Sequence, residues 1–128
     1  MGTNMENLYK PIKTSQLLQY VQMEGEALEK PEVKKKMSTK AMLKRSRQLG
    51  EARMELMTRL KEMDRYSPDF FPVGCKVEYR TLENWYNIKR GKVIGHEGSL
   101  IIVDLIGEQY PLKVEPRFLK LMYIRQKY

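Results

Sequence analysis

The sequence predicts an α+β protein in which an N-terminal helical hairpin precedes a small five-stranded β-domain. The composition changes near Tyr66-Ser67-Pro68. Good helix formers dominate before this point, whereas short runs containing Val, Ile and Tyr, separated by Gly and Pro, follow it. A chain of 128 residues suits one compact domain, or one small domain with an appendage. We therefore expect a helical region at 1–66, a linker at 67–72 and the β-domain at 73–128.

The helical region is expected to open with an extended lead-in at 1–13 and a first helix at about 14–29. Either Thr14 or Ser15 can cap this helix, because a side-chain oxygen there can accept a bond from an unpaired backbone N–H. Leucine and valine side chains follow at helical spacing and predict a buried stripe. Pro31 must end this helix or open the next one.

The second helix is expected to be long and basic, spanning about 31–65. It begins near Pro31 or Ser38, and its continuity is left open because Ser38 can cap a restart. Apolar residues form one narrow stripe along it: Met42, Leu49, Ala52, Leu56, Leu60 and Met63. Burial of this stripe within an αα-hairpin is the simpler interpretation. The alternative is a methionine-rich seam that recruits a partner helix.

Five short strands are expected in the β-domain, bounded by glycines, a proline and one longer loop at 81–88. The third and fourth strands follow Gly98 and Gly107, and residues 116–119 are expected to form a single 3₁₀ turn. The strands are expected at Cys75–Arg80, Gly91–Ile94, Ser99–Leu105, Gln109–Val114 and Leu121–Ile124.

This strand order resembles the SH3-like small barrels, and the KOW and Tudor-like modules among them most closely. The resemblance covers about residues 72–125 and depends on these segments: Gly74-x-x-Val77, Arg90-Gly91-Lys92-Val93, Ile102-Val103-Asp104, Gly107-Glu108 and Val114-x-Pro116-x-x-Leu119. It implies a five-stranded barrel that binds RNA or proteins through loops near Gly91-Lys92-Val93. Such modules occur in ribosomal proteins, transcription elongation factors and chromatin readers. Small basic KOW-like proteins also occur among transcription-modulating phage proteins, which adds transcription regulation and a phage origin to these expectations.

The overall charge favours an anionic partner. Lys and Arg number 24 against 16 Asp and Glu, which gives a net charge of +8. The single cysteine, Cys75, and the single histidine, His96, can form neither an internal disulfide nor a Cys/His zinc site. The longest apolar run has four residues, Leu100–Val103, where a membrane span needs about 20. We expect a cytoplasmic protein with no metal, no cofactor and no enzymatic activity.

The basic residues concentrate between Lys30 and Arg47, where eight of them face the single acid Glu32. The candidate phosphate-binding residues of this segment are Lys34, Lys35, Lys36, Lys40, Lys44, Arg45 and Arg47. On one continuous helix, four of them form a ridge opposite the apolar stripe: Lys36, Lys40, Lys44 and Arg47. A solvated helix face and an acidic protein partner are the alternatives. The absence of a base-reading motif predicts affinity without sequence specificity.

A second candidate contact is the loop that precedes the second strand. Trp85 and Tyr86 could stack on bases while neighbouring cations bind phosphates. The cations of this contact are Arg80, Lys89, Arg90 and Lys92. The alternatives are that Trp85 fills one end of the barrel, or that the loop binds a peptide.

Together these features predict a non-catalytic protein that binds DNA or RNA and acts in transcription or translation. The basic helix supplies affinity for phosphates and the barrel supplies a second contact. The alternative is a protein–protein adaptor that docks on a polymerase, ribosome or virion through its Met-rich helix and barrel loop. Neither a membrane nor a small-molecule substrate is expected. The sequence leaves open the choice of nucleic acid, the identity of any protein partner and the oligomeric state.

Overall fold

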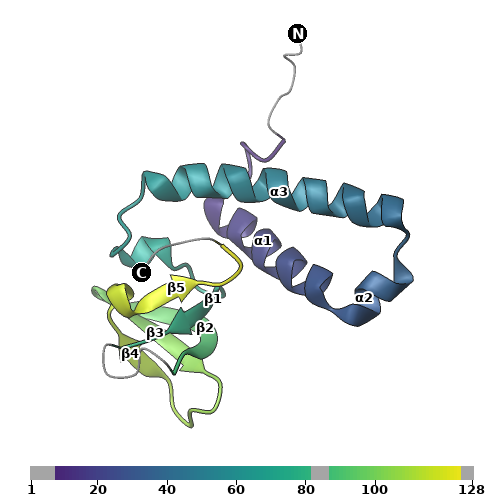
Figure 1. Cartoon of the computed structure of the whole chain (residues 1–128). Coiled ribbons are helices and arrows are strands. Elements are labelled where there is room, and N and C mark those ends of the chain that lie inside the picture. Colours follow the sequence, from purple (N-terminus) through teal and green to yellow (C-terminus); the bar gives the residue numbers. More distant parts are fainter. Residues whose placement is uncertain (1–7, 82–86, 125–128) are drawn as a thin grey trace. The chain divides into compact units, whose positions relative to one another are not determined.

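The computed structural model of the chain describes residues 8–81 and 87–124. The chain divides into a helical unit, Met1–Arg59, and a sheet unit, Leu60–Tyr128, and each is described by itself. Helices precede a five-stranded antiparallel sheet (Figure 1), so the predicted α+β class with an N-terminal helical part is confirmed. Within the described ranges, no helix has the length and apolar content needed to cross a membrane.

The helical unit is a hairpin of α1 (Thr14–Glu29) and α3 (Thr39–Lys61), with α2 (Pro31–Lys36) at its closed end (Figure 1). Two contacts show that α1 and α3 are antiparallel: Arg59 binds Thr14 at the start of α1, and Arg45 binds Glu24 nearer its end. The predicted apolar stripes are largely buried. Their buried members are Leu17, Leu18 and Val21 on α1, and Leu49, Ala52, Leu56 and Leu60 on α3.

The long basic helix expected at about 31–65 is two helices, because the chain breaks at Met37 and Ser38. Met37 has extended backbone angles (φ −99°, ψ 140°). The Ser38 hydroxyl accepts a hydrogen bond from the Ala41 N–H at 3.1 Å, which is the bond of an N-cap. The continuity left open by the sequence is thus decided in favour of a restart.

The second helix also ends earlier than expected, at Lys61 instead of about residue 65. A turn follows it, closed by the Met63 N–H on the Leu60 carbonyl at 3.2 Å. The Asp64 carboxylate then accepts a hydrogen bond from the Tyr66 N–H at 2.9 Å. An aspartate that bonds the backbone two residues on favours a turn over a helix, which accounts for the earlier end.

The described part of the lead-in is a turn at residues 8–11, not the extended segment that the sequence predicts. The physical reason is Arg59 of α3. Its guanidinium donates hydrogen bonds to three carbonyl oxygens and one hydroxyl of this segment: those of Tyr9, Lys10, Ile12 and Thr14. Four acceptors converging on one guanidinium require a curved backbone.

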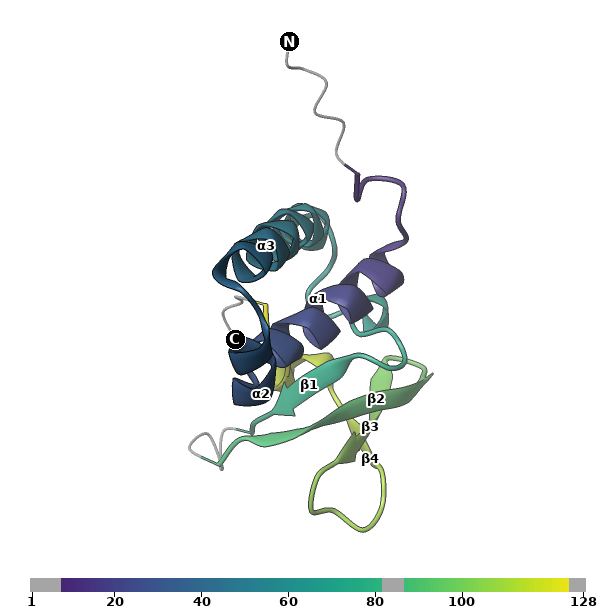
Figure 2. The same ribbon diagram turned by 90° about the vertical axis from the view of Figure 1, so that its right-hand side faces the viewer.

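The sheet unit contains five antiparallel strands in the order β4-β3-β2-β1-β5. They are β1 (Lys76–Tyr79), β2 (Lys89–Glu97), β3 (Leu100–Leu105), β4 (Leu112–Val114) and β5 (Leu119–Leu121). Figure 2 shows β1, β2 and β3 side by side. The predicted 3₁₀ turn is present at Pro116–Phe118, and a second one, not predicted, lies at Pro68–Phe70.

Three strands differ from the prediction by more than one residue at an end. The second strand is longer than the expected 91–94 because β-bulge geometry between Val93 and Gly95 lets the pairing with β3 continue to Glu97. The fourth strand begins at Leu112, after a loop that occupies 106–111. The last strand, expected at 121–124, lies at Leu119–Leu121, where it pairs with β1.

Arg65 anchors the segment that precedes the sheet. Its guanidinium donates hydrogen bonds to the carbonyl oxygens of Pro116, at 3.3 Å, and Leu119, at 2.5 Å. It also lies 5.6 Å and 5.5 Å from the ring centroids of Phe70 and Phe71. Arg65 therefore holds the region after α3 against the last 3₁₀ turn and β5.

Cys75 is buried beside β1, and burial raises the pKa of its thiol to about 12. We expect a thiol reagent at about pH 8 to leave native Cys75 unmodified and to modify it after urea unfolding. Because the pKa of the thiol is higher in the folded state than in the unfolded state, the neutral thiol contributes its full share of the unfolding free energy below pH 9. It is lost between pH 9 and about 12, at about 1.4 kcal/mol per pH unit. A Cys75→Val variant should lack that alkaline loss in urea titrations, and rapid native modification would contradict the assignment.

Candidate nucleic-acid interface

Most of the predicted phosphate-binding residues gather at the closed end of the helical hairpin, on α2 and the first turns of α3. We call this set the hairpin-end cluster; its members are Lys30, Lys34, Lys35, Lys36, Lys40, Lys44 and Arg47. All seven side chains are exposed. None forms an ion pair with another residue of the described ranges. Within residues 30–47, these seven cations and the single acid Glu32 leave a net charge of +6, apart from Arg45.

The cluster has two parts, which corrects the continuous ridge that the sequence predicts. The break at Met37 and Ser38 places Lys34, Lys35 and Lys36 in the last turn of α2. The second part lies on α3, where Lys40, Lys44 and Arg47 follow one another by four and three residues and so share one helix face. Phosphates could therefore contact the cluster on two helices.

Arg45 lies in the same segment but belongs to the hairpin's own packing. Its guanidinium donates two hydrogen bonds to Glu24 of α1, at 2.9 Å from Nε and 2.5 Å from Nη2. The hydrogen bond to Glu24 raises the pKa of Arg45. A further contact at 3.3 Å joins Nη1 to the Met37 sulfur at the break. Arg45 thus ties the closed end together, and its charge is offset by a carboxylate.

The helix dipoles stabilise the cations of one part of the cluster and destabilise a cation of the other part. The lysines of α2 lie in its last turn and Glu32 in its first, which is the favourable arrangement. Lys40 instead lies in the first turn of α3, which contains no acid. A cation at that position costs about 0.3–1 kcal/mol of helix stability. Stability of the hairpin therefore does not explain Lys40, whereas binding of an anion would.

Three of the four predicted cations of the sheet unit are placed beside acids. Lys89 forms an ion pair with Glu108, and Arg90 with Glu78 at 3.3 Å. Lys92 is exposed and lies opposite Asp104 in the register of β2 and β3. Arg80 is half-buried at the end of β1. Trp85 and Tyr86, the predicted stacking residues, lie outside the described residues.

Two exposed apolar side chains lie in the loop between β3 and β4, where the sequence predicts the start of a strand. Ile106 is 79% exposed and Tyr110 is 71% exposed. The loop is held in place, since the Ile106 N–H donates to the Arg90 carbonyl at 2.8 Å and Glu108 pairs with Lys89. The sequence predicts that Tyr110 belongs to a strand that begins at Gln109, whereas the loop opened by the turn at Gly107 (φ +91°) extends to residue 111.

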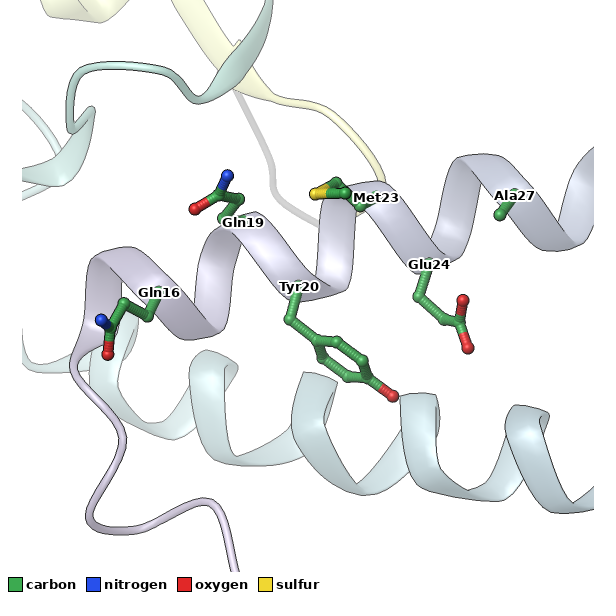
Figure 3. Close-up of a pocket in the computed structure, with 6 residues that line it drawn as sticks. All are labelled: Gln16, Gln19, Tyr20, Met23, Glu24 and Ala27. Carbon is green, nitrogen blue, oxygen red and sulfur yellow. The ribbon is translucent and has the colours of Figure 1, made fainter.

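A shallow hollow of about 390 Å³ follows one side of α1 (Figure 3). It is lined by Gln16, Gln19, Tyr20, Met23, Glu24 and Ala27. Figure 3 shows Tyr20 and Glu24 pointing toward the neighbouring helix and Met23 pointing away from it. Tyr20 stacks on Tyr9 with ring centroids 6.3 Å apart, and Glu24 is held by Arg45. The hollow contains none of the residues that the sequence singles out as a site.

The described residues include no group of three or more His, Cys, Asp or Glu side chains placed to hold a metal ion. Comparisons of the chain with models of protein families, with curated proteins and with solved structures found no match. The interpretation of the hairpin-end cluster therefore depends on its own geometry and charge.

Proposed function

We propose that this protein binds nucleic acid without catalysis, through the hairpin-end cluster. The observation that supports the proposal is the gathering of seven exposed lysine and arginine side chains, six on α2 and α3 and one, Lys30, directly before α2, with no ion-pair partner in the described part of the chain. Such a surface can neutralise several phosphates and release their counterions. It offers no set of base-reading side chains, so the proposal is sequence-independent binding of DNA or RNA. An intracellular, cytoplasmic setting near the nucleoid or the ribosome follows from such a ligand.

We further propose that the sheet unit is an SH3-like barrel of the KOW or Tudor-like type. Its strand order supports this, because β1 pairs with both β2 and β5 and a 3₁₀ turn leads into β5. Within the main proposal, the barrel provides a second contact near Lys92. Roles in transcription or translation, including phage transcription, belong to the same proposal.

One observation on the sheet unit favours a second function, docking on a protein. Lys89 and Arg90 are each paired with an acid, which leaves them less available to phosphates. The anchored β3–β4 loop meanwhile exposes Ile106 and Tyr110, and exposed apolar and aromatic side chains are typical of protein contacts. An adaptor function for the sheet unit is therefore the second candidate.

Binding to labelled DNA and RNA oligonucleotides at two salt concentrations tests the proposed function. If four phosphates are contacted, affinity should fall about 50- to 150-fold between about 50 and about 200 mM salt, with little dependence on sequence. Fluorescence anisotropy with single- and double-stranded probes of each type measures this. Failure to bind at the lower salt concentration, or binding that salt leaves unchanged, would overturn the proposal.

A further inference from the structure

Helix α3 has a second stripe of residues in addition to the one buried in the hairpin. Leu43 is 63% exposed and Met54 is 72% exposed, although both are large and apolar. They belong to a series whose steps alternate between four and three residues: Leu43, Arg47, Gly50, Met54, Met57 and Lys61. This alternation is the heptad spacing of a helix-packing seam. Part of the chain's apolar surface is thus arranged for a further helix.

Gly50 lies at the centre of this stripe. A Cβ added there would meet nothing within 4 Å, so packing inside the chain does not require a glycine. Glycine weakens a helix interior relative to alanine. Its effect on the surface is a flat area between Arg47 and Met54, where another backbone can approach closely. The stripe is therefore shaped for close contact with another helix.

We propose that the occupant is a second copy of this chain, whose α3 packs antiparallel on the first about a two-fold axis between Gln48 and Leu49. This register brings each Leu43 against the second copy's Met54. It also lays each Arg47 across the second copy's Gly50, so that a long side chain fills the flat area. Met57 then covers the stem of Lys40 from the other copy. Every layer combines the two kinds of seam position, as antiparallel pairing requires.

Charge complementarity identifies the second copy as the partner. In this register, the residues flanking the seam bring Lys44 of each copy beside Glu51 of the other, so that two symmetrical ion pairs form. Lys44 and Glu51 are both exposed, and neither has an ion-pair partner within the described ranges. Within one helix they are seven residues apart, too far to pair with each other. The partner helix supplies the opposite charge that each of them lacks.

A parallel arrangement of the same stripes is unfavourable. It would bring the two hairpin-end clusters together, with Lys40 and Lys44 of one copy level with the same residues of the other. Antiparallel packing places Lys40 of one copy near Met57 of the other and so separates the two Lys40 positions by about 25 Å along the helix axis. The electrostatic repulsion between the clusters is then largely screened at ordinary salt.

The dimer is independent of nucleic-acid binding and can be measured without it. Lys44 and Arg47 would face the second copy, which leaves Lys34, Lys35, Lys36 and Lys40 as the main phosphate contacts at each end. A monomeric chain that still binds nucleic acid would refute the dimer alone. A dimer that binds no nucleic acid would refute the proposed function alone.

Sedimentation equilibrium of the full chain, with charge reversals at the proposed pair, tests the inference. Lys44→Glu and Glu51→Lys should each weaken dimerisation about tenfold, because each replaces two attractions by two repulsions. The double variant should return the dissociation constant to within about threefold of the original, since the pairs re-form with signs exchanged. Lys44→Glu lowers the net positive charge of each copy, so a general charge effect would strengthen dimerisation instead of weakening it.

Control variants make the same charge changes outside the stripe, at exposed positions near the two ends of α1. Lys13→Glu and Glu29→Lys should leave dimerisation unchanged, and circular dichroism should show all variants folded. Leu43→Gln should weaken the dimer at least as much as either charge reversal. A wild-type chain that remains monomeric up to about 0.5 mM would overturn the proposal. The proposal would also be overturned if the loss of dimer affinity in the double variant equalled the sum of the losses in the two single variants.

Discussion

Replacement of Gly91 by alanine is expected to lower the unfolding free energy of the sheet unit by about 3 kcal/mol or more. Gly91 lies in the middle of β2, paired with Val77 of β1 on one side and with Leu105 of β3 on the other. A Cβ at this position would lie 2.2 Å from the Asp104 carbonyl oxygen and 2.8 Å from the Leu105 Cα. Both are backbone atoms of a paired strand, so the two strands would have to separate.

Gly95 of the same strand provides the matched control. A Cβ at Gly95 would first meet the Ile102 side chain at 3.6 Å, which is an ordinary contact. Gly95→Ala should therefore change stability by less than about 1 kcal/mol. Urea unfolding measures the stability of both variants, and hydrogen exchange of the Val93 and Ile106 amides, which bond to Cys75 and Arg90, reports on the pairing around β2. Equal losses at the two positions would show that Gly91 is not needed for close approach of the strands.

The sequence predicts the helices and the sheet because both patterns are local. The stripe through Leu49 and Leu56 recurs with the helix period, and Gly91 and Gly107 lie where the sheet needs close approach or a turn. The break before α3 could not be decided in this way. An N-cap at Ser38 contributes about 1 kcal/mol, which is close to what an unbroken helix through Met37 would gain.

The site is less predictable than the fold because a sequence shows which residues are charged but not which distant residue forms an ion pair or hydrogen bond with each of them. Arg45 and Arg47 are neighbours of the same type, yet Arg45 is held by Glu24, 21 residues away. Arg59 and Arg65 each converge on backbone carbonyls of distant segments. The exposure of Tyr110 is likewise not predictable, because the short segment between Gly107 and Pro116 predicts a strand as readily as a loop.

Removal of three charges from the hairpin-end cluster is expected to weaken nucleic-acid binding about 30-fold or more at about 100 mM salt. The variant is Lys35→Gln, Lys36→Gln and Lys40→Gln, and the reason is that each lost phosphate contact removes its share of counterion release. Stability should not fall, since these side chains are exposed and make no ion pair in the described part of the molecule. The removal of Lys40 from the first turn of α3 should raise the stability of that helix slightly. The loss of Lys35 and Lys36 from the last turn of α2 has the opposite effect, so we expect affinity to fall with little net change in stability.

A second triple variant separates the position of the charges from their number. Lys10, Lys13 and Lys61 are exposed lysines at the opposite end of the hairpin, and their replacement by Gln leaves the same net charge of +5. Within one copy, Lys61 lies about 30 Å along α3 from Lys40, beyond the reach of a phosphate bound at the cluster. Both triple variants are compared at protein concentrations well below the dimer dissociation constant, because the proposed dimer would bring Lys61 near the second copy's Lys40. We expect this control to weaken binding less than about threefold. The slope of log affinity against log salt concentration should stay near that of the original chain in the control, whereas the cluster variant should reduce the magnitude of that slope by about two to three. Equal losses in the two variants would mean that nucleic acid responds to the overall charge, and the hairpin-end cluster would then not be its binding surface.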